Sequence, residues 1–549
     1  MAFSCHRFAF SLLAAGACTL LARPSHAAPT VLTQCQVINQ SGSYVLGADI
    51  TVPNADICFS IRAADVSFDG AGKTITVQSS EALEVAHFSG TAPAHVSVKN
   101  FKSNGGVRIY GNDISDVTFD GLEVDGINNM GGDEVVIQNN KVGQYGIAVS
   151  NGDQTDWAPL KNKVLNNQIT GGATDVKILL EVIGGKVHPC PRTDTLLENN
   201  TILNTRNDPP PEATASVRIR CATHSIFRKN QIRGTGTTIG LYLRDESDDG
   251  TYEDNVFWVN TQEAIRIASG NVDKTFPSRN VFKNNVFRSD QGPATFLQGI
   301  GSENHFQNNC FLSKESGLIN QNAGNVYDHN TFYVTGTDSR VHTLDYEDPV
   351  KDVWTRNIFS HSGKDTLGFG GLFTFARYSG DENLFHNRAG AVAFGNMATS
   401  LADWKQKSLA DGNASEQSSI EADPLLIDPE NGNLCLSENS PARGAAKDGT
   451  DLGAKPYGCT GGGATGGAAG AGGAAGSGAA GGGGAGGSGG ATAGSGGASA
   501  GGAKASGDSS DDGGCGCRTA PSSRSTWLSI AGVLGLAWSS IRRRLTRDR

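Results

Sequence analysis

A short pattern, apolar-x-apolar-x-Asn-Asn-x-apolar, recurs along the middle of this 549-residue chain and constrains its fold more than any other feature. The copies align on one asparagine, which falls at Asn140, Asn167, Asn200, Asn230, Asn255, Asn285, Asn309, Asn330 and Asn357. Successive copies lie between 21 and 33 residues apart, so the motif is constant while the unit varies in length. The apolar residues alternate with period two, which indicates short strands rather than helices. The pattern therefore predicts stacked coils of parallel strands, joined by loops of variable length.

Stacking these coils would bury the inward Ile, Val and Phe side chains as continuous columns. The aligned Asn has a structural role in this prediction. We expect it to adopt a left-handed conformation at a bend and to hydrogen-bond the same or the next coil, forming a ladder. Degenerate copies begin at Val66, Val96 and Val117, which brings the expected number to about 12 coils with a spacing of roughly 4.8 Å.

The chain resembles the right-handed parallel β-helix superfamily, which includes polysaccharide-lyase-like proteins, over about residues 30–457. Both ends of this region contribute to the resemblance: the segment CQVINQSGSYVLGADITVPNADICFSI from Cys35, and the segment from Ala402 with its Asp-Pro-Leu and Ser-Pro-Ala turns. The resemblance implies an all-β fold, a right-handed parallel β-helix with capped ends. Caps are needed because an open end would expose a strand edge.

The first 27 residues predict a signal peptide, and residues 28–458 the β-helix. An apolar run from Phe8 to Ala22 is followed by Ser25-His26-Ala27, a small-x-small cleavage site. A membrane anchor is the weaker alternative, because the run is short and ends near Pro24. The protein is therefore expected to be exported.

Export would permit disulfide bonds. Six of the 11 cysteines form sequence-local candidate pairs: Cys35 with Cys58, Cys190 with Cys221, and Cys435 with Cys459. Cys310 is left over inside a repeat, where a buried apolar role is expected rather than a reactive thiol.

Residues 459–513 are rich in Gly, Ala and Ser and predict a disordered linker. Residues 514–549 contain Cys515 and Cys517, a hydrophobic run from 527 to 541 that would form a short helix, and a basic end at 542–544. This arrangement resembles the myxobacterial C-terminal sorting tail. The resemblance implies a sorting protease and the membrane as partners, and a location at the cell surface or outer membrane.

Charged residues between the Asn motifs predict a binding face. Turning the apolar residues of each intervening strand inward places an alternate set outward. That set contains Arg108, Lys177, Glu181, Arg218, Arg220, Tyr242, Arg244 and Arg266. The net charge of −10 argues against a nucleic-acid partner, whereas a local basic stripe suits an acidic polysaccharide or extracellular matrix.

Two functions remain open for this stripe. In a lyase acting by β-elimination, Arg108, Arg218, Arg220, Arg244 and Arg266 would bind substrate carboxylates, and Tyr242 or Lys177 would be the catalytic base or acid. In a non-catalytic surface adhesin or matrix protein, the same residues would bind glycan or simply discourage strand pairing. The catalytic signatures of the pectin-hydrolase-like β-helices are missing, apart from Arg218-Ile219-Arg220, which is similar to their Arg-Ile-Lys.

An acidic turn follows the stripe directly. Asp245, Asp248 and Asp249 could supply oxygen ligands to Ca²⁺, the one cofactor that the sequence suggests. The run lacks EF-hand spacing, so an ordinary Asp/Ser/Gly turn is the alternative.

Overall fold

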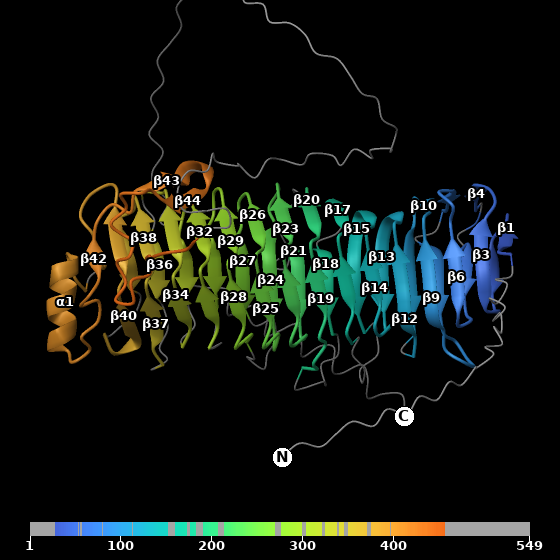
Figure 1. The fold of residues 1–549 in the computed structure, drawn as a ribbon, viewed down its shortest axis with the longest axis horizontal. Coiled ribbons are helices and arrows are strands. Elements are labelled where there is room, and N and C mark those ends of the chain that lie inside the picture. Colours follow the sequence, from blue (N-terminus) through green and yellow to red (C-terminus); the bar gives the residue numbers. More distant parts are fainter. Residues whose placement is uncertain are drawn as a thin grey trace, which may run out of the picture. The chain divides into compact units, whose positions relative to one another are not determined.

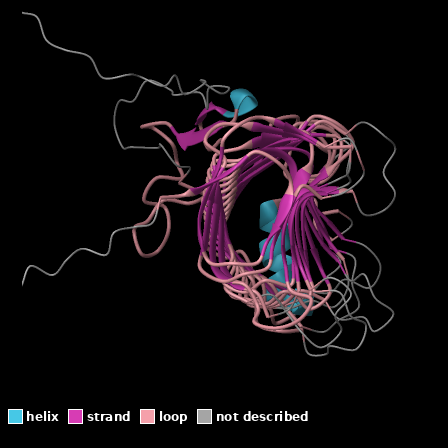
Figure 2. Ribbon diagram, turned by 90° about the vertical axis from the view of Figure 1, so that its right-hand side faces the viewer, coloured by secondary structure: helices cyan, strands magenta, loops and turns pink. Residues whose placement is uncertain are grey.

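The structure is a computed structural model that describes residues 28–455, except 53, 55–56, 79–80, 112, 152–159, 173–175, 183–189, 207–213, 269–275, 299–302, 321–323, 338–339, 345–349, 370–374 and 396. These residues form a right-handed parallel β-helix, as predicted, in which most coils contribute one strand to each of three parallel sheets (Figures 1 and 2). The predicted signal peptide, linker and sorting tail, including Cys459, Cys515 and Cys517, lie outside the described residues.

Sheet 1 precedes the Asn turn of each coil and contains fifteen strands. The expected 12 coils did not include two at the amino end, which lack the motif, and one at the carboxyl end, which contains Asn383. Its strands are β1 (Thr30–Leu32), β3 (Gly42–Leu46), β6 (Val66–Asp69), β9 (Ala94–Lys99), β12 (Ser115–Asp120), β14 (Val136–Gln138), β16 (Lys163–Leu165), β19 (Leu196–Glu198), β22 (Ile226–Arg228), β25 (Thr251–Glu253), β28 (Val281–Lys283), β31 (His305–Gln307), β34 (Val326–Asp328), β37 (Asp352–Thr355) and β40 (Tyr378–Asp381).

Sheet 2 follows the Asn turn, and sheet 3 follows sheet 2. Two long strands, β13 (Glu123–Met130) and β15 (Lys141–Ser150), pass through both sheets. The other strands of sheet 2 are β4 (Ile50–Thr51), β7 (Thr74–Thr76), β10 (Lys102–Ser103), β17 (Gln168–Gly171), β20 (Thr201–Asn204), β23 (Gln231–Gly234), β26 (Val256–Val259), β29 (Val286–Ser289), β32 (Cys310–Ser313), β35 (Thr331–Val334), β38 (Ile358–His361), β41 (Leu384–Asn387) and β42 (Ile420–Glu421). The other strands of sheet 3 are β2 (Gln36–Ile38), β5 (Phe59–Ile61), β8 (Glu81–Ala86), β11 (Gly106–Tyr110), β18 (Val176–Glu181), β21 (Ala215–Arg220), β24 (Ile239–Arg244), β27 (Ile265–Ala268), β30 (Thr295–Leu297), β33 (Leu318–Asn320), β36 (Arg340–Leu344) and β39 (Asp365–Phe369).

The Asn ladder is confirmed. Each aligned Asn is buried and donates from Nδ2 to Oδ1 of its counterpart one coil further, as Asn140 does to Asn167 and Asn285 to Asn309 (both 3.0 Å). The ladder continues past Asn357 to Asn383, whose amide donates to the buried carboxylate of Glu416. One detail of the prediction was wrong: the left-handed residue is the one before each ladder Asn, for example Asn284 (φ 56°), because this outer position makes the bend while the ladder Asn turns inward.

Columns of identical side-chain type fill the interior. In sheet 1 the rings of Phe282, Phe306, Tyr327 and Trp354 stack one upon the next, with centroids 4.6, 5.1 and 3.7 Å apart. A second column of Phe side chains runs through sheet 2. The predicted inward columns are therefore present, and Cys310 is free and buried, as expected.

The carboxyl end of the β-helix carries a cap. Helix α1 (Leu401–Ala410) is capped by Ser400, whose side chain accepts a hydrogen bond from the Asp403 backbone N–H. The buried Trp404 of this helix packs against Phe375 and Phe394. Figure 1 shows this helix across the end of the stack. Phe375 belongs to the short 3₁₀ helix η1 (Phe375–Arg377). In the described part of the chain, no helix is both long and apolar enough to cross a membrane.

The segment after α1 returns along the outside of sheet 2. It contains β43 (Leu426–Asp428), the 3₁₀ helix η2 (Pro429–Asn431) and β44 (Asn433–Leu436). Leu434 and Ala454 pack on Leu312 and Tyr333, and the Lys455 backbone N–H donates to Asn308. Within the described residues, this returning segment packs on sheet 2 and makes no such contact with the outer face of sheet 3.

Candidate functional site

The outer face of sheet 3 brings together five of the predicted site residues. Arg218 on β21, Tyr242 on β24 and Arg266 on β27 are direct cross-strand neighbours. Arg220 and Arg244 form a second pair beside them. We call these five residues the arginine cluster. Arg108 lies on the same face but four strand steps away, on β11, so it is not part of the cluster.

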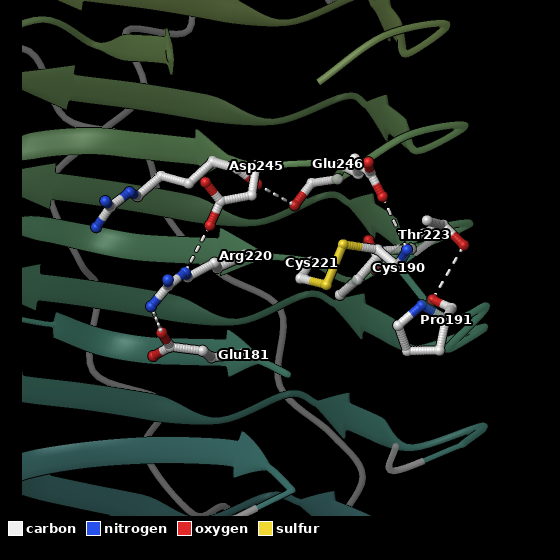
Figure 3. The surroundings of a disulfide bond; sticks show 12 residues. Glu181, Cys190, Pro191, Arg220, Cys221, Thr223, Asp245 and Glu246 are labelled. Atoms are coloured by element: carbon white, nitrogen blue, oxygen red, sulfur yellow. Dashed lines mark hydrogen bonds and ion pairs between the residues drawn. A yellow bond between two sulfur atoms is a disulfide. The ribbon is translucent and has the colours of Figure 1, made fainter. Parts of the chain in front are cut away.

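Most of the cluster is neutralised by carboxylates, which corrects the expectation of a basic stripe. Glu181 binds both Arg218 (3.1 Å) and Arg220 (2.7 Å), and Asp245 binds Arg220 (2.6 Å), as Figure 3 shows for Arg220. Arg266 pairs with Glu263 at 2.7 Å. Arg108 is likewise bound to Glu84 at 2.8 Å. The sequence stripe looked basic because these acidic partners come from neighbouring coils or turns.

The ion pairs hold Arg220 firmly in place. Burial alone would lower the pKa of Arg220, but hydrogen bonds to Asp245 and Glu181 outweigh burial and raise it. Arg220 is therefore a fixed cation between two buried carboxylates. Such a network is rigid, because each charge is oriented by its neighbours.

Arg244 differs from the other arginines of the cluster. Within the described residues, its guanidinium has no carboxylate at ion-pair distance. It lies over the ring of Tyr242 at 5.3 Å, and Arg266 lies near the same ring at 5.8 Å. Arg244 thus carries the uncompensated positive charge of the cluster.

Tyr242 is largely covered. Its exposed fraction is 6%, and its ring packs in a small apolar cluster with Ala215, Ile239 and Ala268. Two guanidinium groups also contact the ring, a cation–π arrangement that fixes its orientation. The ring is thus a positioned part of the face rather than a mobile surface group.

Lys177 does not join the cluster, which corrects its predicted exposure to solvent. Its side chain is fully buried, and Nζ donates to the backbone carbonyl of Gln144 at 2.6 Å. Glu181, at the other end of β18, faces the arginines of the outer face and is buried as well, so an outward position in this strand does not guarantee exposure. Lys177 therefore faces no solvent in which to bind a substrate.

The acidic turn after β24 is engaged in ion pairs. Asp245 holds Arg220, whereas Asp248 and Asp249 hold Arg279, each at 2.8 Å. Burial raises the pKa of Asp248, while the hydrogen bond from Arg279 lowers that of Asp249. Within the residues described, no group of three His, Cys, Asp or Glu side chains could hold a metal ion, so the expected Ca²⁺ site has no counterpart there.

A disulfide bond lies directly beside the cluster. Cys190 and Cys221 are bonded, as expected, and Cys221 follows Arg220 in the chain (Figure 3). The Cys190 backbone N–H also donates to Glu246 at 2.9 Å. The pair Cys35–Cys58 is confirmed as well. Cys435 is disulfide-bonded, and its predicted partner Cys459 lies outside the described residues.

A second polar depression, which the sequence did not suggest, lies on sheet 2 where the returning segment crosses it. It is open to solvent and is lined by Arg288, Lys314, Tyr333 and Glu430, among others. The Tyr333 hydroxyl donates to Glu430 at 2.5 Å, and the guanidinium of Arg388 lies 4.0 Å from the centre of the Tyr333 ring. Burial and the bond to Glu430 raise the pKa of Tyr333. Glu430 lies 97 residues after Tyr333 in the chain, so no sequence pattern indicated that these two residues are in contact.

Comparison with known proteins places the chain by its fold. A family model described as "Right handed beta helix region" matches residues 183–337. A search of curated proteins finds no match. Similar solved structures include the periplasmic alginate epimerase AlgG (10% identity, 57% of this chain and 73% of that chain, TM-score 0.32). Another is the AlgE6 A-module, a mannuronan C-5 epimerase of Azotobacter vinelandii (13% identity, 70% and 91%, TM-score 0.31). With TM-scores this low, neither structure supports a substrate or a site for this chain.

Proposed function

We propose that this is an exported protein that binds an acidic polysaccharide on the outer face of sheet 3, at the arginine cluster. The observation that carries the proposal is Arg244, a guanidinium without a carboxylate partner in the described structure, next to a positioned ring and a rigid ion-pair network. A uronate carboxylate could accept from two guanidinium N–H donors of Arg244, since Arg binds carboxylates bidentately. The two disulfides support export.

The neutralised arginines also have a role in this proposal. Because Arg218 and Arg220 are bound by Glu181, the face has little excess charge and would not hold every polyanion alike. Charged hydrogen-bonding groups fixed in this way can orient sugar hydroxyls through their remaining donors and acceptors. Selectivity would then come from the network and attraction from Arg244.

Cleavage by β-elimination is a second candidate, favoured by the position of Tyr242 between Arg218 and Arg266. In this reaction a base removes the proton α to the uronate carboxylate, and the electron pair forms a C=C bond as the glycosidic oxygen leaves with a proton. Tyr242 would serve as base or acid, and Arg244 and Arg266 would neutralise the enolate-like charge. The coverage of Tyr242 and the pairing of Arg266 with Glu263 favour binding without turnover, as in an adhesin or matrix protein.

Retention at the cell surface belongs to the same proposal and rests on the sequence of residues 514–549. A sorting protease would process the tail, and its hydrophobic run would be the membrane-contacting part. A chain ending at residue 513 should be released into the medium, whereas the full chain should fractionate with the cell envelope. Release of both forms would remove the sorting proposal without affecting the glycan site.

Affinity electrophoresis against alginate, pectate and glycosaminoglycans tests the binding proposal. At least one acidic polysaccharide should retard the wild type, and Arg244→Ala should weaken that retardation about tenfold in affinity. Arg228→Ala, on the outer face of sheet 1, is the matched control and should bind as the wild type does. Unchanged mobility on every polysaccharide would overturn the proposal. Incubating the protein with the polysaccharide that it binds distinguishes a lyase from an adhesin. A lyase would release an unsaturated product that absorbs ultraviolet light, whereas an adhesin would not.

A further inference from the structure

Two aromatic rings are exposed at the amino-terminal end of the same outer face. Phe88, in the turn after β8, is 57% exposed, and Tyr110, the last residue of β11, is 45% exposed. Their ring centroids are 6.2 Å apart, so they form one continuous apolar surface. Large aromatic side chains normally bury their rings, and an exposed pair on a polar surface indicates a contact site.

Arginines flank both rings. Arg62 lies over Phe88 at 4.8 Å, and Arg108 lies near Tyr110 at 5.7 Å. Arg108 is neutralised by Glu84, but the exposed Arg62 donates to the Ser60 hydroxyl and has no carboxylate partner in the part of the chain that the structure describes. Rings and Arg62 together therefore offer a stacking surface next to a free positive charge.

Strand register connects this surface to the arginine cluster. Tyr110 is aligned through Met130, Ser150, Glu181 and Arg220 with Arg244, which amounts to five strand steps on one face. At roughly 4.8 Å per step, the two places are about 24 Å apart. A single extended polymer running along the β-helix could therefore contact both.

We propose that Phe88, Tyr110 and Arg62 form a distal subsite that stacks a sugar ring of the same acidic polysaccharide, an inference that rests on the proposed function. The C–H face of a pyranose is apolar and packs on an aromatic ring, while its carboxylate can reach a guanidinium. The occupant is the glycan rather than a protein, because the apolar surface is only two rings wide and adjoins an unpaired cation on the face already assigned to the glycan.

Chain length is the variable that tests this subsite. Oligosaccharides too short to span about 24 Å should bind at Arg244 alone, whereas polymers should gain affinity from both places. The double variant Phe88→Ala/Tyr110→Ala should bind polymer about tenfold more weakly and short oligosaccharides unchanged. Arg244→Ala should weaken both. Tyr110→Phe, which keeps the ring, should retain polymer affinity.

A matched control and an unfolding curve accompany the measurement. Ile226→Ala removes an exposed apolar side chain from sheet 1 and should leave polymer binding unchanged. The Phe88, Tyr110 and Ile226 variants should keep the wild-type unfolding midpoint, since these side chains are exposed. Wild-type polymer affinity in the double variant would overturn the subsite alone. Failure of the wild type to bind any glycan would remove the proposed function and the subsite together.

Discussion

The inner and outer sides of the coils follow opposite rules. Inside, each position repeats the same kind of side chain from coil to coil, such as the stacked rings of Phe282, Phe306 and Tyr327. Outside, many charged side chains face an opposite charge, as Arg220 does between Glu181 and Asp245. Like side chains stack well when they are apolar or amide, whereas like charges on neighbouring strands repel. Stability should therefore depend mainly on the inner columns. Binding should depend on the outer charges that have no opposite partner in the described structure, such as Arg244.

The largest effect should come from breaking an inner aromatic column. Phe306→Ala removes a fully buried ring stacked between Phe282 and Tyr327 and should lower the free energy of unfolding by about 3–5 kcal/mol. Denaturant unfolding measures this loss. Phe306→Leu, which keeps most of the volume, should lose only about 1 kcal/mol. Equal losses for the two variants would show that the stacking column is not what stabilises this coil.

Breaking the Asn ladder should lower the free energy of unfolding by about 3 kcal/mol. Asn285→Ala removes bonds from Nδ2 to Tyr252 O (2.8 Å) and Asn309 Oδ1. It also leaves the buried Asn255 backbone N–H without its acceptor and removes one of the two acceptors of Asn255 Nδ2. The neighbouring Asn284 occupies the left-handed position, where Gly fits, so Asn284→Gly should change stability little. A larger loss for Asn284→Gly than for Asn285→Ala would contradict the ladder's role.

The charged end of the ladder should make stability depend on pH. Burial raises the pKa of Glu416 from 4.5 to about 7. Between these values the unfolded chain releases this proton while the folded chain keeps it, so the contribution is full below pH 4.5 and is lost as pH rises through 7. The wild type should lose about 2 kcal/mol over that range relative to Glu416→Gln. Parallel stability curves for the two proteins would contradict this prediction.

On the outer face of sheet 3, the effect on stability should be smaller. Glu181→Gln leaves Arg218 and Arg220 without their shared carboxylate, but both guanidinium groups reach solvent, so we expect a loss of about 1–2 kcal/mol. The variant also gains a net positive charge at the cluster. Its retardation by acidic polysaccharide should therefore increase, and weaker retardation than that of the wild type would argue against an electrostatic attraction there.

The smallest effect should come from the exposed pairs of sheet 1. Arg228 and Glu198 form a 2.9 Å pair that is open to solvent. Arg228→Ala should change the free energy of unfolding by less than about 0.5 kcal/mol. Thermal unfolding at low and high salt would reveal any larger contribution as a salt-dependent difference from the wild type.

The inner side of the fold could be predicted because the sequence repeats there. The aligned asparagines indicated the coils, the ladder and the inward columns. A second ladder, in which Asn280 donates to Asn304 and Asn304 to Asn325, was missed because these residues precede the strand instead of following it and do not occur in pairs. The two confirmed disulfides join cysteines that are 23 and 31 residues apart, respectively. Both separations are close to the length of one coil.

The outer side was harder to predict, since charge compensation depends on which residues become neighbours across coils. Asp248 and Arg279 lie about 30 residues apart, close to one repeat, and this spacing could have indicated their pairing. Arg220 and Glu181 are 39 residues apart, outside the range of the repeat, so the sequence placed both on the outward face without indicating that they pair. The burial of Lys177 was missed because strand alternation indicates which face a side chain is on, and not whether that face is covered.

The Asn ladder also has a direction. Every side chain in it donates to the carbonyl oxygen of the next, so the amide dipoles point the same way from Asn140 to Asn383. The Asn of a coil inserted within the row could accept a hydrogen bond from the Asn before it and donate one to the Asn after it. At the carboxyl end the row closes on the carboxyl group of Glu416, whose oxygens accept from the side chains of Asn383, Tyr378 and Ser419. The β-helix can thus be lengthened in its middle, whereas growth beyond Asn383 would require Glu416 to be displaced.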